Sequence, residues 1–385
     1  MRKSLLFFVV LWALFVNTNF GYYLGLPNLV FIAYSPLLFF GLTLRHNYRG
    51  VKNTSSISIL ILSIFVIIVK AIWGQDFVRE SLTFLAIPAL LTIVLRRLTP
   101  SDTKILQHAV IVFFLIECLL AMYERATLNT FFYIEGSFDN SDNIEDWSFR
   151  ASSLFGHPIA NTMIIATFIV FVSCSCLGTL LKYSLVFIGI ASILCFNVRG
   201  ALLMSLVVAC YIYVKDNSFK GRNKIVSYLF ISVCLLLLVY ILTQTSLGGR
   251  LMNYYDANGL EDSSTLARFA ILSFMNFIDF QTLLTGDMDL MEVVMAKMGL
   301  VGVENGFIAI VLLYGLLLSI PIFFFLFVDV LKKLSVYPTY KKTAIMICFF
   351  GIGATNPHLA DSTQWCIFTF LYYAFSPFPS SSYEK

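Results

Sequence analysis

Apolar stretches separated by short polar segments recur along almost the whole chain. A helix needs about 20 mostly apolar residues to cross roughly 30 Å of hydrocarbon. By this measure the pattern predicts an all-α integral membrane protein with about 12 transmembrane helices, eleven or thirteen being the nearest alternatives. We expect them to form one polytopic domain over 1–385. The predicted spans are 4–20, 22–44, 57–73, 81–95, 105–123, 153–177, 180–197, 200–214, 225–245, 302–328, 343–356 and 362–378.

Two polar segments are long enough to form structure of their own. The first, 124–152, is acidic and carries aromatic residues, a combination that suits sugar binding. The alternative is a solvated loop whose aromatic residues lie at the membrane interface. The second, 246–301, contains a helix-start signal at Asp262-Ser263-Ser264-Thr265, followed by apolar residues. It predicts amphipathic interfacial or re-entrant helices that cover a cavity.

Composition and charge agree with a membrane protein and set its expected orientation. Hydrophobic residues make up 59% of the chain and charged residues 12%, far from ordinary soluble usage. Lys and Arg outnumber Asp and Glu in the loops on the side that carries Arg2 and Lys3, and the reverse holds on the other side. The positive-inside rule then places both termini in the cytoplasm and both long segments in the periplasm. The net charge of +4 arises from basic residues spread over the cytoplasmic loops, where they set the orientation and contact anionic lipid head groups. Nucleic-acid binding is therefore not expected.

Thiols and two charges lie within the predicted spans. All eight cysteines fall there, without the spacing of a disulfide framework or a zinc site. We therefore expect neither a disulfide nor a metal, and no cofactor. Lys70 and Glu117 fall in the outer halves of their spans, where an unpaired charge is costly. This cost suggests that the two side chains neutralise each other.

Three arginines on the expected outer side are candidates for binding phosphate. Arg199 stands at the outer end of the seventh span, Arg268 lies on an amphipathic outer helix, and Arg250 begins the loop before it. A guanidinium group matches two phosphate oxygens at once and keeps its charge. Together they predict a cationic pocket for a pyrophosphate at the bilayer surface. The alternative for Arg199 is an interfacial contact with lipid head groups.

The same rim carries candidates for acid–base chemistry. Glu304 lies at the outer end of the tenth span, followed by Asn305 and a glycine. A carboxylate partly out of water suits a general base, although an acid at a helix start is also favoured by the helix dipole. His157 and His358 are predicted at this rim as well, where either side chain could accept a proton or bond a sugar; a structural role is the alternative for both.

The order and spacing of several motifs resemble those of the O-antigen polymerase and O-antigen ligase superfamily. A segment that starts at Arg150 is similar to one frequent in the polysaccharide-polymerase branch. The resemblance covers roughly 150–320. Outside this range the chain is similar to the superfamily only in being polytopic. The motifs are Arg150-Ala151-Ser152-Ser153-Leu154-Phe155-Gly156-His157-Pro158, Asn197-Val198-Arg199-Gly200-Ala201-Leu202-Leu203, Leu266-Ala267-Arg268 with Thr285-Gly286, and Val303-Glu304-Asn305-Gly306-Phe307 with Tyr314-Gly315.

This resemblance implies a glycosyltransferase with a GT-C-like architecture, working at the periplasmic face of the bacterial inner membrane. Its substrate would be a glycan linked to undecaprenyl diphosphate, and attack on the anomeric carbon would invert it without a metal. Arg199 and Arg268 would bind the pyrophosphate and stabilise the charge it gains on leaving. Glu304 would activate the acceptor hydroxyl, at the position where ligases typically carry a histidine. We assign substrate binding to Arg150, His157, Arg250, Asn305 and His358.

The implied activity is polymerisation of polysaccharide repeat units, each growing glycan being transferred to the next lipid-linked unit. The glycan would be O-antigen of lipopolysaccharide, capsule or exopolysaccharide, and the implied partners are a flippase, a chain-length regulator and membrane lipids. A ligase that joins finished glycan to another acceptor is the first alternative. A non-enzymatic exporter is the second, but a transporter should carry interrupted half-helices near the midplane, and here the charges gather at the outer rim.

Overall fold

A computed structural model describes residues 2–27, 29–43, 54–132, 149–217, 232, 271–298 and 303–377. Within these ranges every regular element is a helix, as the hydrophobic pattern predicts. Five helical segments are long and apolar enough to cross a membrane, and the two shorter apolar helices at 29–41 and 158–174 accompany them. The five segments are Thr54–Ile72, Val78–Leu95, Pro100–Thr127, Thr179–Phe196 and Gly306–Val336.

The helices lie where the sequence predicts apolar spans, while the count of about 12 membrane crossings stays a prediction. Each predicted span within the described ranges contains a helix, and the span at 225–245 lies outside them. In chain order the helices are α1 (Arg2–Val16), α2 (Asn19–Tyr23), α3 (Leu29–Thr43), α4 (Thr54–Ile72), α5 (Val78–Ser81), η1 (Leu82–Ala86), α6 (Ile87–Leu95), α7 (Pro100–Thr127), α8 (Pro158–Cys174), α9 (Thr179–Phe196), α10 (Arg199–Asn217), η4 (Ile271–Phe277), α14 (Phe280–Thr285), α15 (Leu290–Met298), α16 (Gly306–Lys333), η5 (Leu334–Val336), α17 (Thr339–Gly353), η6 (Pro357–Ala360) and α18 (Ser362–Phe375).

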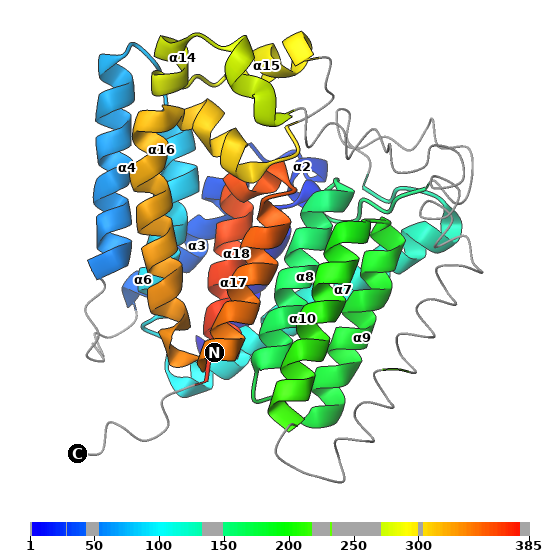
Figure 1. The fold of residues 1–385 in the computed structure, drawn as a ribbon. Coiled ribbons are helices and arrows are strands. Elements are labelled where there is room, and N and C mark those ends of the chain that lie inside the picture. The colour runs from blue at the N-terminus through cyan, green and yellow to red at the C-terminus, as the bar shows by residue number, and fades with distance from the viewer. Residues whose placement is uncertain are drawn as a thin grey trace, which may run out of the picture.

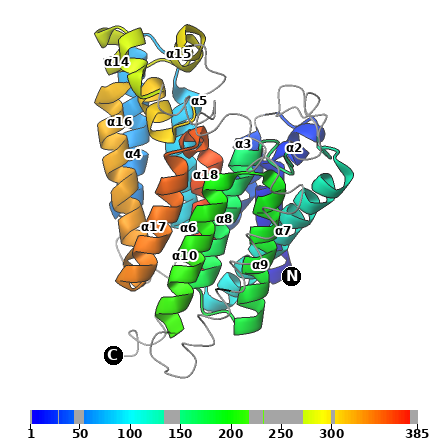
Figure 2. The same cartoon turned by 45° about the vertical axis from the view of Figure 1, so that its right-hand side comes forward.

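The helices form one bundle with α17 and α18 at its centre (Figures 1 and 2). On one side α8 packs against α17 and α18 and also against α9 and α10, while on the other side α4 packs against α16. The small helices α14 and α15 lie across one end of the bundle, where α14 packs on α16 (Figure 1). This is the segment in which the sequence predicts interfacial helices, and its first part, 246–270, lies outside the described residues.

Ion pairs support the predicted division of the chain into two sides. Arg2 bonds Asp102 at 3.0 Å, and Lys341 bonds Asp216 at 3.0 Å. All four residues belong to loops or helix ends that the sequence assigns to the cytoplasmic side. Which end of the bundle faces the cytoplasm rests on the positive-inside rule and stays a prediction.

Two boundaries differ from the prediction: one helix is longer than expected, and the next begins later. The helix α7 continues to Thr127, so Glu124 is a buried helical residue and does not open a solvated loop. Its carboxylate accepts hydrogen bonds from the backbone N–H groups of Ser152 and Ser153, both at 2.8 Å. The predicted span at 153–177 therefore begins as a helix only at Pro158. Irregular backbone inside a membrane protein needs such internal partners.

The helix α16 is broken near its start. Gly315 has a φ of 77° and a ψ of 160°, so the predicted span 302–328 is two helical pieces rather than one. The first piece, 306–314, runs obliquely across the end of the bundle, and the second runs along it (Figure 1). A Cβ atom at Gly315 would lie 2.2 Å from the carbonyl oxygen of Leu284, so only glycine permits this close approach. The break lies near the end of the bundle and not at its midplane.

The side chain of Lys70 connects the first piece of α16 to the end of α14 at this break. Its buried Nζ donates to the carbonyl oxygens of Thr285 at 2.6 Å, Gly286 at 3.1 Å and Leu313 at 3.0 Å. It also donates to Gln75 Oε1 at 2.9 Å. The expected neutralisation of Lys70 by Glu117 is therefore wrong: the broken helix supplies carbonyl partners for the ammonium group, and the Glu117 carboxylate instead accepts the N–H of Leu154 at 3.3 Å.

Candidate functional site

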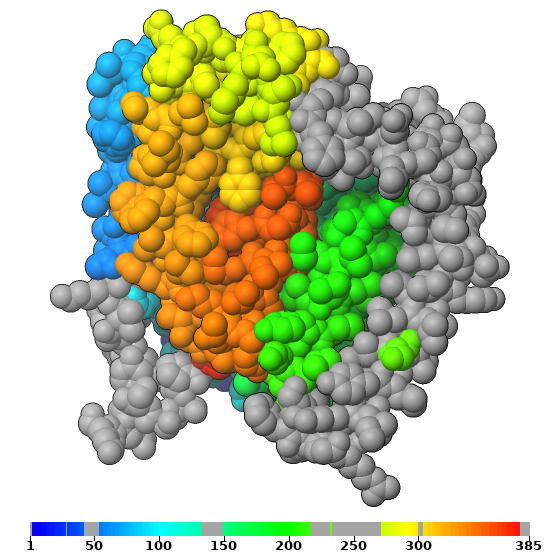
Figure 3. All heavy atoms as spheres, viewed as in Figure 1, coloured from blue at the N-terminus to red at the C-terminus, as the bar shows by residue number. Residues whose placement is uncertain are grey.

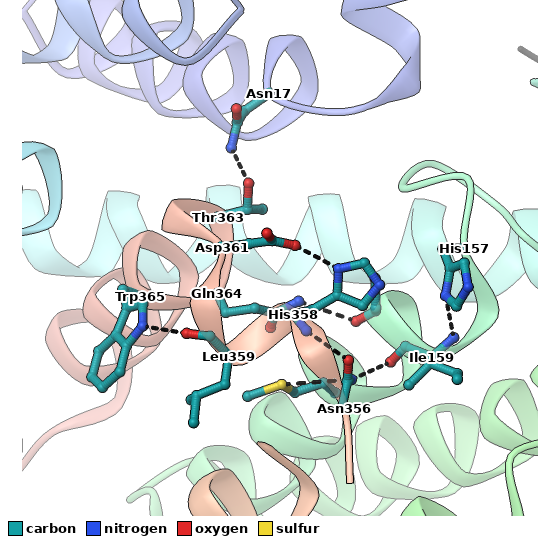
Figure 4. Close-up of polar contacts among 12 residues, drawn as sticks. Asn17, His157, Ile159, Asn356, His358, Leu359, Asp361, Thr363, Gln364 and Trp365 are labelled. Carbon is teal, nitrogen blue, oxygen red and sulfur yellow. Dashed lines mark hydrogen bonds and ion pairs between the residues drawn. The ribbon is translucent and has the colours of Figure 1, made fainter. Parts of the chain in front are cut away.

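The short helix η6 joins α17 to α18 at the bundle end that also carries α14 and α15, and Asn356 fixes its position. Asn356 is fully buried, and its Oδ1 accepts the N–H of His358 at 2.9 Å. Its Nδ2 donates to the carbonyl oxygen of Ile159 at 3.0 Å (Figure 4). One buried side chain thus connects η6 to the first turn of α8 and brings two distant parts of the sequence together.

Both predicted rim histidines lie at this junction. Their ring centroids are 5.0 Å apart, with an angle of 55° between the planes. His358 Nδ1 contacts Asp361 Oδ2 at 2.5 Å, and His157 Nδ1 accepts the N–H of Ile159 at 3.3 Å (Figure 4). The side chain of His358 is 23% exposed and that of Asp361 is 52% exposed, so a molecule at the rim can reach them.

His157 is held in its neutral form. Burial, followed by the repulsion that His358 and Arg150 would exert on a charged ring, lowers the pKa of His157 from its usual 6.5 to about 3. The imidazole is therefore uncharged at neutral pH. Because its Nδ1 accepts a hydrogen bond, the ring hydrogen is on Nε2, which makes His157 a hydrogen-bond donor toward anything bound beside it.

The Glu304 motif packs against the same junction. A Cβ atom added at Gly306 would lie 2.4 Å from Leu359 Cβ and 2.7 Å from the carbonyl oxygen of Asn356, so the first turn of α16 touches η6. Asn305 caps α16, its Oδ1 accepting the N–H groups of Phe307 at 3.0 Å and Ile308 at 3.1 Å. Glu304 directly precedes this cap and is partly exposed.

One of the predicted cationic residues lies at the turn between α9 and α10, and a second contacts this turn. Asn197 adopts a φ of 55° there, and Arg199 begins α10 and is partly exposed. Arg150 Nε donates to the carbonyl oxygen of Phe196 at 3.4 Å, which holds the segment before α8 against this turn. The charge of Arg150 contributes to lowering the pKa of His157, so the two side chains are close to each other. The turn that Arg150 contacts therefore lies at the same end of the bundle as the histidine pair. Arg250 and Arg268 lie outside the described residues, so their part in a cationic pocket stays a prediction.

An apolar groove of about 680 Å³ starts beside these polar groups. Its walls are α16 and α17, which lie side by side on the face shown in Figure 3. Phe307 and Leu359, the immediate neighbours of Gly306 and His358 in the sequence, are among its lining residues. Exposed side chains follow along it, among them Phe324 at 62% and Ile347 at 50%. The lining residues are Phe307, Ile310, Phe323, Phe324, Leu326, Phe327, Met346, Ile347, Phe350, Gly351, Leu359 and Trp365.

The sequence interpretation missed two residues of the junction. Asp361 follows His358 by three positions, a spacing that can bring two side chains onto one side of a turn and was the available signal. Asn356 precedes Pro357 in the sequence, and nothing local indicates that its amide reaches α8. In the described part of the chain, no three side chains of the metal-binding types come together.

Comparisons with models of protein families and with curated proteins find no match for this chain.

Proposed function

We propose that the chain is a membrane glycosyltransferase that polymerises polysaccharide repeat units, moving a growing glycan from undecaprenyl diphosphate onto the next lipid-linked unit. The observation that carries the proposal is the contact between a polar junction and an apolar groove. The junction, formed by His157, His358, Asp361 and Glu304, offers acid–base groups. The groove begins at its side and follows α16 and α17. A substrate with a sugar head and a hydrocarbon tail matches this arrangement.

The groove favours a lipid-linked substrate over a soluble sugar. Its volume of about 680 Å³ lies within the range of roughly 300–1,000 Å³ that is usual for ligand pockets. Aromatic and aliphatic side chains make up its lining, which suits a chain without hydrogen-bonding groups. A tail in this groove would leave the attached diphosphate at the level of His358 and Glu304, beside the end of the bundle where the resemblance places the chemistry.

The charges at this end suit departure of a diphosphate. Arg199 lies at the turn between α9 and α10, and Arg150, which precedes α8, bonds the end of α9 beside it. Arginine stabilises the charge that develops on a leaving phosphate. By the resemblance, Arg199 works together with Arg268. The reaction, in which an acceptor hydroxyl attacks the anomeric carbon, needs a base within hydrogen-bonding reach of that hydroxyl. The junction provides candidates in Glu304 and His358.

A ligase remains the second candidate because of one contact. Ligases typically carry a histidine ahead of the asparagine, where this chain has Glu304 followed by Asn305. The close approach of Gly306 to Leu359 brings a histidine, His358, to that region from another part of the sequence. His358, which belongs to η6, would then take the catalytic role of the ligase histidine.

Gels of lipid-linked and surface glycans test the proposal in the host from which the gene has been removed, compared with the restored strain. A polymerase predicts that the ladder collapses to single repeat units on their final acceptor, and that the restored gene brings the ladder back. Full-length chains that stay on the carrier lipid would contradict polymerisation and favour the ligase. Export is distinguished by purified protein in vesicles, because a polymerase lengthens lipid-linked glycan there without any transfer across the bilayer.

A further inference from the structure

The two histidines of the junction differ in the hydrogen that each ring carries. His358 Nδ1 lies 2.5 Å from a carboxylate oxygen of Asp361, and a carboxylate accepts hydrogen bonds, so this nitrogen carries the hydrogen. The Nε2 of His358 is then left with a lone pair. In His157 the assignment is reversed, since Nδ1 accepts the backbone N–H of Ile159 and Nε2 carries the hydrogen. One ring therefore offers an acceptor and the other a donor.

We propose that His358 is the general base of the transferase reaction, oriented by Asp361, and that His157 donates a hydrogen bond to the same acceptor hydroxyl. This inference rests on the proposed function and names the base that the sequence left open. An alcohol is the group that suits the pair, because its oxygen accepts one hydrogen bond while its hydrogen is donated in another. Ring centroids 5.0 Å apart keep both rings within reach of a single hydroxyl.

The surroundings separate the roles of the two rings. His157 is largely enclosed and carries no charge at neutral pH, so it donates without competing for the proton. His358 is more accessible and has a carboxylate behind it, which stabilises the imidazolium that forms when it accepts a proton. Glu304 lies partly exposed before the first turn of α16, which touches η6, and we assign it an electrostatic role there.

The step is balanced without a metal or a further reactant. The acceptor hydroxyl gives its proton to Nε2 of His358 while its oxygen forms a bond to the anomeric carbon. The bond between that carbon and the diphosphate oxygen breaks, and the diphosphate leaves with the electron pair. His358 then releases the proton to water, and the configuration at the anomeric carbon is inverted because attack comes from the side opposite the leaving group.

A double substitution separates an orienting role of Asp361 from a structural one. The groups around His358 are Asp361 on its own turn, His157 and Arg150 on the side of α8, and Glu304 before α16. Asp361→Asn should lower kcat with little change in KM, because the imidazolium formed in the step loses its carboxylate partner. It should have no further effect on kcat once His358 has been replaced, whereas a residue with only a structural role would lower kcat by the same factor in both backgrounds.

The test uses the full chain in lipid vesicles with lipid-linked repeat units, measuring kcat and KM. His358→Gln should lower kcat by about 10²–10⁴-fold, the usual contribution of a general base, with little change in KM. His157→Asn keeps an oxygen that caps α8 but shortens the donor, and should mainly raise KM for the acceptor. His108→Gln, an exposed histidine bonded to the carbonyl of Lys104 in its own helix, is the matched control and should act as wild type.

Imidazole rescue separates chemistry from folding. His358→Ala should regain part of its activity when imidazole is added, since a free ring can occupy the space and accept the proton. If wild type lengthens the glycan and His358→Gln keeps its kcat, the inference is wrong while the proposed function stands. If Asp361→Asn folds and keeps the kcat of wild type, the orienting role is refuted. If wild type lengthens no lipid-linked glycan, the proposed function fails, and the inference fails with it.

Discussion

Replacing Lys70 with methionine should loosen the broken start of α16 and little else. Methionine has a similar length, so the apolar stem keeps its packing, but the ammonium group and its hydrogen bonds are lost. The three backbone partners are the carbonyl oxygens of Thr285, Gly286 and Leu313. Gly286 keeps another side-chain donor there, since Gln75 Nε2 bonds the same oxygen at 2.8 Å.

The cost follows from the two carbonyl groups that lose this donor. A buried polar group left without a partner costs about 1–3 kcal/mol, which gives about 2–6 kcal/mol for Thr285 and Leu313 together. Both residues are only partly buried, so water reaches some of the vacated space and the lower half of that range applies. We expect a local free-energy cost of about 2–4 kcal/mol, a change of roughly 30-fold to 1,000-fold in an equilibrium constant.

Hydrogen exchange of the protein in lipid nanodiscs measures this change. Backbone amides in the first piece of α16, 306–314, should exchange faster in Lys70→Met by that factor, while those in the second piece should change far less. The difference arises because Lys70 bonds the end of the first piece directly. Activity should fall with the loss of protection, because this piece carries the Glu304 motif against η6.

Lys332→Met is the matched control. Lys332 is an exposed residue near the far end of α16, and its Nζ bonds only the exposed hydroxyl of Thr54 at 3.2 Å among the contacts described. It should change exchange in 306–314 by less than a factor of two. Equal protection of that piece in wild type and Lys70→Met would refute the reasoning, because the carbonyl bonds of Lys70 would then contribute nothing to the position of the half-helix.

Three further predictions concern the same end of the bundle. Gly306→Ala should lower both activity and the thermal midpoint, because its Cβ would lie 2.4 Å from Leu359 Cβ, whereas Gly200→Ala, whose Cβ has open space, should leave the midpoint unchanged. Glu124→Gln should cost about 1–3 kcal/mol in thermal unfolding, since an amide cannot accept at both of its ends; an unchanged midpoint would argue against the carboxylate contacts. The folded pKa of His157, about 3, lies below its usual 6.5, so unfolding takes up a proton below pH 6.5 and stability falls as pH decreases. Thermal midpoints measured from pH 7 to pH 4 should therefore drop for wild type and depend less on pH in His157→Asn, and parallel curves would contradict this.

Much of the helical arrangement could be predicted from the sequence because apolar length is a local property. A run such as 57–73 must be a helix if it crosses a membrane, since only a helix satisfies every backbone group within the segment. The helix α4 bears this out at Thr54–Ile72. The prediction was less accurate at 153–177, where buried carboxylates from α7 satisfy an irregular backbone, and at 302–328, where the close packing of Gly315 interrupts the helix.

For the candidate site, too, the sequence indicated some features and only the structure showed the others. The sequence by itself determined which residues are polar at the ends of apolar spans, and so nominated Glu304, His157 and His358, because a charge or an imidazole is costly elsewhere in such a chain. Only the tertiary structure decided that the two histidines meet, that Asp361 stands behind one of them, and that an apolar groove begins at their side. These contacts join segments about two hundred residues apart through the buried amide of Asn356, and a contact between distant segments depends on how whole helices pack, which no local pattern records.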